Sequence, residues 1–229
     1  MRHRWWYLSG VGFAVALVVG FIMSAGAYPD DNKAPDADWI KVMSNSSDRT
    51  TIIIGAYVLF VAGLLFLWFA ASIRSELRSE ETSGSVLASV ANASAVVFVT
   101  LLLIGALALA SVPASITFGD STVPAADFAR QLSQFGVGAM LAPGALVAAL
   151  YVASTSRLGA VAGLFSRGVA IAGYVAAVLL LFGAFFIPFL ALPIWAIVVG
   201  IALARRPVTS TSTAGRTSVP SAAPTDVSA

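Results

Sequence analysis

Residues 168–204 read GVAIAGYVAAVLLLFGAFFIPFLALPIWAIVVGIALA, a run of 37 residues without one charged side chain. A single straight helix of that length would reach about 55 Å. The apolar core of a bilayer is only about 30 Å thick. Basic residues flank the run, with Arg167 before it and Arg205 and Arg206 after it. If both ends face the same compartment, the run must cross a membrane twice.

The long run is therefore predicted to hold two spans, 168–187 and 188–204. Pro188 marks the expected hairpin between them, because proline begins helices well and continues them badly. Pro193 is expected to kink or thin the second of these spans.

Four further apolar stretches reach the roughly 20 residues that a membrane helix needs. They are residues 5–27, 51–73, 85–112 and 132–154. The predicted fold is therefore all-α, a polytopic transmembrane bundle of six spans within residues 1–206. Residues 207–229 are almost entirely Ser, Thr, Pro, Ala and Val, which predicts a disordered cytoplasmic tail.

The composition supports a membrane location and excludes several kinds of site. The chain is 59% hydrophobic and 10% charged, whereas soluble domains carry about 25% charged residues. It has no cysteine, and His3 is its only histidine, so we expect no disulfide, metal site or cofactor. No basic stripe with interleaved aromatics is present, which argues against nucleic-acid binding.

The basic residues predict the orientation of the bundle. Six spans place both termini on one side, together with the 74–84 and 155–167 loops. That side carries nine of the thirteen basic residues and four acidic ones, whereas the other side carries four basic and seven acidic residues. The nine are Arg2, Arg4, Arg74, Arg78, Arg157, Arg167, Arg205, Arg206 and Arg216. The positive-inside rule then puts both termini in the cytoplasm and the 28–50 and 113–131 loops outside.

The first span also resembles a secretory signal peptide. A basic tip precedes it, and Ala25-Gly26-Ala27 offers a cleavage site. Its apolar run from Trp5 to Met23 is longer than the usual 7–15 residues of a signal peptide. We favour an uncleaved span, while cleavage after Ala27 would leave five spans and an external N-terminus.

Both outer loops are predicted to contain helices. In the first, the apolar positions Trp39, Ile40, Val42 and Met43 share one helix face after the acidic pair Asp36 and Asp38, which predicts a short helix on the membrane surface. In the second, a helix is expected to open at Pro124, with Thr122 or Val123 as its cap and Asp127 in its first turn.

The predicted spans contain no ionisable Asp, Glu, Lys or Arg, so the strongest polar side chain within them is Asn92. The candidate site is an intramembrane polar cluster, which would form either a pocket for a small substrate or a hydrogen-bonded packing seam between helices. Its members are Tyr57, Ser89, Asn92, Ser94, Gln134 and Tyr174. We favour the packing seam. Pro143-Gly144 is expected to kink the fourth span.

The chain resembles a family of six-helix membrane proteins of high-GC Gram-positive bacteria that is known as a domain of unknown function. The resemblance rests on the surface segment Ala37-Asp38-Trp39-Ile40 and on the run Phe66-Leu-Trp-Phe-Ala-Ala-Ser-Ile-Arg74 that closes the second span. It covers about residues 5–206. It implies the six-helix architecture and a bacterial plasma membrane, and it supplies no site residues.

The sequence predicts a non-enzymatic accessory, scaffold or regulatory membrane component, with the lipid bilayer and another membrane protein or a second copy as its partners. The alternative is a small permease or channel-like protein for a small neutral or apolar solute. An intramembrane enzyme is disfavoured, because nucleophile–base pairs and metal sites need side chains that the spans lack.

Overall fold

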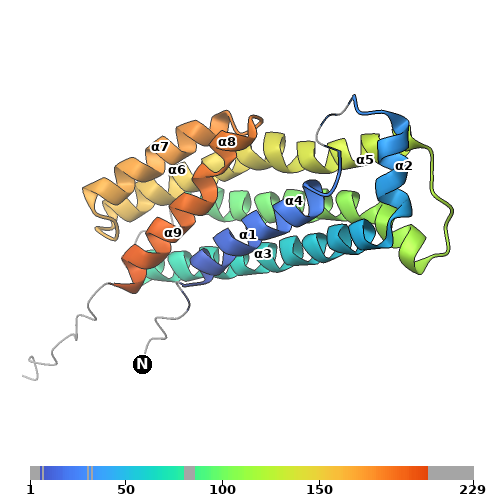
Figure 1. The fold of residues 1–229 in the computed structure, drawn as a ribbon. Helices are drawn as coiled ribbons and strands as arrows, with labels where there is room; N and C mark the ends of the chain where they lie inside the picture. The colour runs from blue at the N-terminus through green and yellow to red at the C-terminus, as the bar shows by residue number, and fades with distance from the viewer. Residues whose placement is uncertain (1–5, 7, 30, 32, 80–85, 206–229) are drawn as a thin grey trace, which may run out of the picture.

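The computed structural model describes residues 6, 8–29, 31, 33–79 and 86–205, and it is an all-α bundle (Figure 1). The predicted tail, the basic N-terminal tip and the acidic pair Glu80 and Glu81 lie outside the described residues. The helices are α1 (Ser9–Ala25), α2 (Asp36–Ser44), α3 (Ser46–Ser79), α4 (Val86–Phe118), α5 (Ala126–Ala139), a π-helical turn (Met140–Gly144), α6 (Ala145–Val161), α7 (Arg167–Leu181), α8 (Phe186–Phe189) and α9 (Ala191–Ala204).

Four helical segments are long and apolar enough to cross a membrane, which supports a membrane location. They are Ser46–Leu77, Val86–Phe118, Ala126–Val161 and Phe186–Ala204. The helices Ser9–Ala25 and Arg167–Leu181 are apolar but shorter. The helix α3 has 34 residues and is therefore about 51 Å long, so it extends well beyond a bilayer core.

The bundle has two ends (Figure 1), and their charged residues differ. The terminal end is where α1 begins and α9 finishes, and it carries Arg74, Arg157, Arg167 and Arg205 near the ends of α3, α6, α7 and α9. The α2 end carries α2, the 113–125 connection and the start of α5. The described acidic residues of this end are Asp31, Asp36, Asp38, Asp48, Asp120 and Asp127. The predicted segregation of charge along the chain is thus also a segregation in space.

The last apolar run folds into a helical hairpin, but the turn differs from the predicted one. The chain reverses at 182–185, between α7 and α8, rather than at Pro188. Pro188 lies inside the short helix α8, and the second arm is interrupted at Leu190. Pro193 accounts for that interruption, because it has no N–H to offer to the Phe189 carbonyl four residues earlier.

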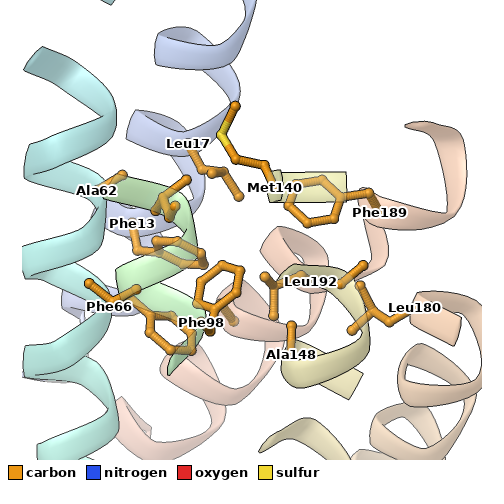
Figure 2. Packing of buried hydrophobic residues seen from close by; sticks show 14 of the residues in the cluster. Phe13, Leu17, Ala62, Phe66, Phe98, Met140, Ala148, Leu180, Phe189 and Leu192 are labelled. Carbon is orange, nitrogen blue, oxygen red and sulfur yellow. The ribbon is translucent and has the colours of Figure 1, made fainter. Parts of the chain in front are cut away.

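Aromatic side chains fill the centre of the bundle (Figure 2). Phe13 of α1, Phe66 of α3 and Phe98 of α4 are at most 1% exposed. The ring centroid of Phe66 lies 4.8 Å from that of Phe13 and 4.9 Å from that of Phe98. Met140 and Leu102 are equally buried. The three phenylalanine rings, here called the aromatic layer, pack with these two side chains in the middle of the bundle.

Glycines bring the helix pairs together. A Cβ atom on Gly55 of α3 would meet the backbone nitrogen of Ser24 in α1 at 2.5 Å and the Met23 Cβ at 2.8 Å. In the α4–α5 pair, a Cβ on Gly105 would meet the Gly136 carbonyl oxygen at 2.6 Å, and the reverse contact would be 2.7 Å. Small residues of this kind allow membrane helices to approach closely and gain dispersion energy where no hydrophobic drive exists.

Two prolines inside long helices are accommodated in different ways. Pro113 of α4 leaves the Leu109 carbonyl without its usual helical donor. The Tyr28 hydroxyl donates to that carbonyl oxygen at 2.7 Å, from the segment that follows α1. Pro143 instead lies in the π-helical turn, at the place where the sequence predicted a kink.

The predicted short helix of the first outer loop is confirmed as α2, with Trp39 and Met43 each 1% exposed. Ile40 of the predicted apolar face is largely exposed instead. The second predicted helix is α5, but it begins at Ala126 rather than at Pro124, and its N-cap residue Ala125 makes no side-chain cap.

Candidate functional site

The six polar residues singled out from the sequence do not form one cluster. Tyr57 and Tyr174 are 65% and 40% exposed on α3 and α7. Gln134 lies in α5 at the α2 end, and it lines a different cavity from Asn92. Ser89 is exposed and Ser94 is buried on α4, and neither lines a cavity described below.

Asn92 is engaged at the terminal end. Its side-chain oxygen accepts a hydrogen bond of 2.8 Å from the Arg74 guanidinium, which ties α4 to α3. The two residues line both a small pocket of about 30 Å³, which Tyr151 and Thr155 also line, and a groove of about 390 Å³ on the surface of α3 and α4. The small pocket has room for little more than one water molecule, so it cannot hold a substrate.

A cavity of about 760 Å³ lies near the α2 end, and it is larger than the two described above. Cavities of roughly 300–1,000 Å³ are typical of sites for small molecules. Four aromatic side chains contribute to its wall, namely Phe21, Tyr28, Trp39 and Phe186. Beside these aromatic residues, its polar lining residues are Ser133 and Gln134 of α5, and none of the described residues that line it is charged. We call it the α2-end cavity.

The length of the last hairpin explains why this cavity exists. The helix α7 has 15 residues and α9 has 14, so the hairpin covers only part of the long α5–α6 segment (Figure 1). On the other side, α1 packs against α3 and α9, while α5 packs against α4. A gap thus remains between α1 and α5, next to the hairpin turn on its α2-end side. Ala184 and Phe186 of the turn region line the cavity there. It is partly open to the exterior.

Trp39 forms part of the cavity wall and contacts two other residues of the site. The Arg130 guanidinium lies 5.5 Å from the indole centroid, and the Tyr28 ring centroid lies 5.6 Å away. The indole is 1% exposed, yet its N–H has no hydrogen-bond partner among the described residues. A buried donor without a partner is costly, and this N–H is one of the unsatisfied buried groups of the described residues.

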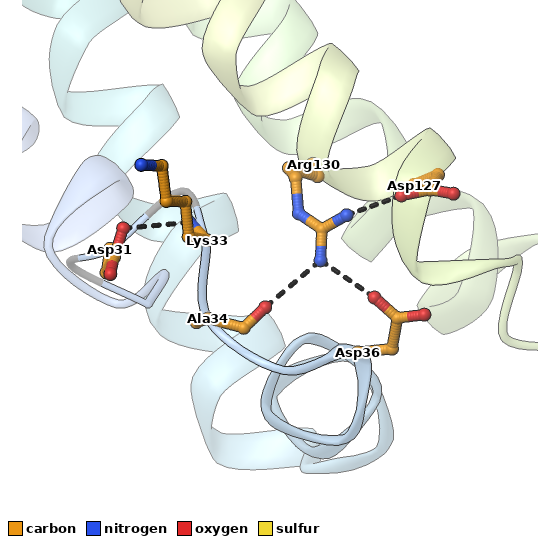
Figure 3. A network of polar contacts seen from close by, with 6 residues as sticks. All are labelled: Asp31, Lys33, Ala34, Asp36, Asp127 and Arg130. Carbon is orange, nitrogen blue, oxygen red and sulfur yellow. Dashed lines mark hydrogen bonds and ion pairs between the residues drawn. The ribbon is translucent and has the colours of Figure 1, made fainter.

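Arg130 fastens α2 to α5 beside the cavity (Figure 3). It donates at 2.8 Å to the Asp36 carboxylate and at 3.1 Å to the Ala34 carbonyl oxygen, and it also pairs with Asp127. Its Nε is buried and has no partner in the described part of the chain. We call these contacts the Arg130 network.

Tyr28 joins the network to the bundle. Its ring contacts Trp39 and its hydroxyl donates to the Leu109 carbonyl of α4. Burial raises the pKa of the Tyr28 hydroxyl above its ordinary value, because the charged phenolate would lose its hydration. The hydroxyl therefore remains a neutral donor at physiological pH.

The site was not predicted from the sequence, which singled out neither Tyr28 nor Arg130 as a site residue. Two signals were present. Arg130 is the single arginine of the segment 113–131, which also holds Asp120 and Asp127, and Pro113 requires a donor from elsewhere for the carbonyl four residues before it. Within the described ranges, no group of His, Asp and Glu side chains could hold a metal ion.

Comparison of the chain with protein-family models, curated proteins and solved structures gave no match.

Replacing Arg130 with glutamine is expected to loosen α2. Both carboxylates of the network are mostly exposed, 67% and 73%, and would regain water, so the cost stays near 1–2 kcal/mol. Amide hydrogen exchange across 36–44 should accelerate roughly tenfold. The exposed cation Lys41 on α2 provides the matched control, and its replacement by glutamine should leave exchange unchanged. Equal rates in wild type and Arg130→Gln would show that the apolar contacts alone hold α2.

Proposed function

We propose that this chain is a non-enzymatic membrane component that holds an apolar or amphipathic molecule in the α2-end cavity. The observation that carries the proposal is the cavity itself, about 760 Å³ with an aromatic wall and an uncharged polar edge. Apolar walls with a few placed polar groups are typical of ligand sites. The proposal makes the protein an accessory or regulatory component that responds to a molecule dissolved in the membrane.

The proposed setting is the plasma membrane of a bacterium, with six spans, both termini in the cytoplasm and the α2 end outside. The basic residues of the terminal end and the acidic residues of the α2 end support this orientation through the positive-inside rule. The cavity would then lie in the outer half of the bilayer, because Phe21 and Ala25 belong to the first predicted span. Its ligand would enter sideways from lipid, between α1 and α5.

A permease is the second candidate, since cavities occur toward both ends of the bundle. The aromatic layer argues against it. Phe13, Phe66 and Phe98 pack ring against ring between the cavities, and cores of this kind are close-packed. A solute could pass only if this layer opened. We therefore rank ligand binding above transport.

Gly138 provides a way to fill the cavity, since it lines the space and a Cβ there would meet nothing within 4 Å. Wild-type protein in nanodiscs is expected to bind phenylnaphthylamine, a neutral apolar fluorophore, above the background of empty nanodiscs. Gly138→Phe should weaken binding roughly tenfold or more, which is a loss of at least about 1.4 kcal/mol.

Gly168 is the matched control, because it is equally open to substitution but does not line the cavity. Gly168→Phe should bind the fluorophore as wild type does. Equal binding by all three proteins would exclude the cavity as the site. Uptake of a small neutral solute by liposomes containing the wild type alone would favour the permease instead.

A further inference from the structure

We propose that the groove on the surface of α3 and α4 binds an anionic phospholipid, with the lipid phosphate against Arg74 and an acyl chain along the groove. The groove has a volume of about 390 Å³. It lies toward the terminal end of the bundle, where α3 and α4 pack side by side (Figure 1). The α2-end cavity is toward the other end, so this inference does not rest on the proposed function.

The lining of the groove changes from apolar to polar along both helices. On α3, Leu67 and Ala71 line it about two turns and one turn before Arg74. On α4, which runs the opposite way, Val96 lines it one turn beyond Asn92. Both helices therefore place apolar side chains toward the middle of the bundle and polar ones toward the terminal end. A phospholipid at a bilayer surface has the same order, with its charge outermost and its chains inside.

Arg74 gives the groove an accessible cation. Its side chain is exposed, and its guanidinium donates at 2.8 Å to the side-chain oxygen of Asn92. Asn92 is a neutral partner, so the bond orients the guanidinium without cancelling its charge. A guanidinium has five N–H donors in a planar fork that matches two phosphate oxygens. No described residue that lines the groove is acidic, so a phosphate meets no like charge there.

Two tryptophans indicate that Arg74 lies at the level of lipid head groups. Trp6 and Trp68 are 50% and 54% exposed, and their ring centroids are 5.3 Å apart. Exposed tryptophans are typical of the boundary between a membrane and water. Arg74 follows Trp68 by six residues on α3, which is about 9 Å closer to the terminal end. Basic pockets between membrane helices at this level bind anionic lipid head groups.

Native mass spectrometry of the full-length protein can test the proposal. The protein is released from detergent micelles that contain equal amounts of phosphatidylglycerol and phosphatidylcholine, and the lipid that stays bound is identified. Wild type should retain phosphatidylglycerol in preference. Arg74→Gln should lower that preference roughly fivefold, as expected for one basic residue near charged lipid. Glutamine can still donate to Asn92, so the contact between the helices is kept.

Arg167→Gln is the matched control. Arg167 is an exposed arginine of the same end that does not line the groove, so its loss should leave the lipid preference unchanged. Ala71→Phe fills the apolar part of the groove from an exposed position and keeps the cation. It should lower the retained phosphatidylglycerol by a factor similar to that of Arg74→Gln.

Four results would overturn the proposal. Equal losses in Arg74→Gln and Arg167→Gln would attribute the preference to the general positive charge of the terminal end. Unchanged retention in Ala71→Phe would show that no chain lies in the groove. Displacement of the lipid by glycerol phosphate, which has no acyl chain, would indicate a site for a soluble phosphate. A dimer that Ala71→Phe dissociates would assign the groove to a second copy of the chain.

Discussion

Replacing Gly55 with alanine is expected to destabilise the protein by about 1–3 kcal/mol, the usual cost of overpacking a close contact. The new methyl would meet the Ser24 backbone nitrogen at 2.5 Å and the Met23 Cβ at 2.8 Å. Backbone atoms cannot rotate away, so α1 as a whole must move from α3. The loss should appear as a lower unfolding temperature of the purified protein in detergent.

The direction of this effect is opposite to that of intrinsic helix propensity. Alanine is favoured over glycine inside a helix by up to about 1 kcal/mol, so a helix free of tertiary contact would gain from the change. Gly138→Ala provides that comparison, since nothing lies within 4 Å of its Cβ position. It should be neutral or stabilising. If both variants melt alike, the α1–α3 contact is looser than the structure places it.

The all-α fold and its long apolar helices could be predicted from the sequence, because the length and charge of each apolar run can be read along the chain. The run 168–204 was expected to form a hairpin if both of its ends face one compartment, and the structure folds it as a helical hairpin. The exact helix ends were less accessible. The helix α3 begins at Ser46, several residues before its apolar run. Its first turns pack against α2, and hydropathy does not report such a contact.

The candidate site could not be predicted in the same way. Lipid is as apolar as the interior of a bundle, so hydropathy does not separate the two faces of a membrane helix. Tyr57 and Tyr174 therefore seemed equivalent to buried polar residues, although both are substantially exposed. The α2-end cavity depends on tertiary packing. It arises where the α7–α9 hairpin, whose first helix has 15 residues, leaves part of the longer α5–α6 segment uncovered.

Tyr28→Phe is expected to cost about 1–3 kcal/mol, the penalty for a buried polar group that loses its partner. The Leu109 carbonyl depends on the Tyr28 hydroxyl because Pro113 cannot supply the helical N–H. Tyr174→Phe is the matched control, since Tyr174 is 40% exposed and its hydroxyl serves no proline-freed carbonyl of the described helices. That variant should unfold at the wild-type temperature.

The dependence on Pro113 makes the explanation testable by a double-mutant cycle. In a Pro113→Ala background, the alanine N–H can bond to the Leu109 carbonyl, so Tyr28→Phe should then cost less than about 1 kcal/mol. Unfolding temperatures of the four proteins in one detergent give the interaction energy. An equal cost of Tyr28→Phe in both backgrounds would mean that the hydroxyl serves another contact. A reduced cost would establish that the Tyr28 hydroxyl takes the place, at the Leu109 carbonyl, of the backbone N–H that Pro113 lacks.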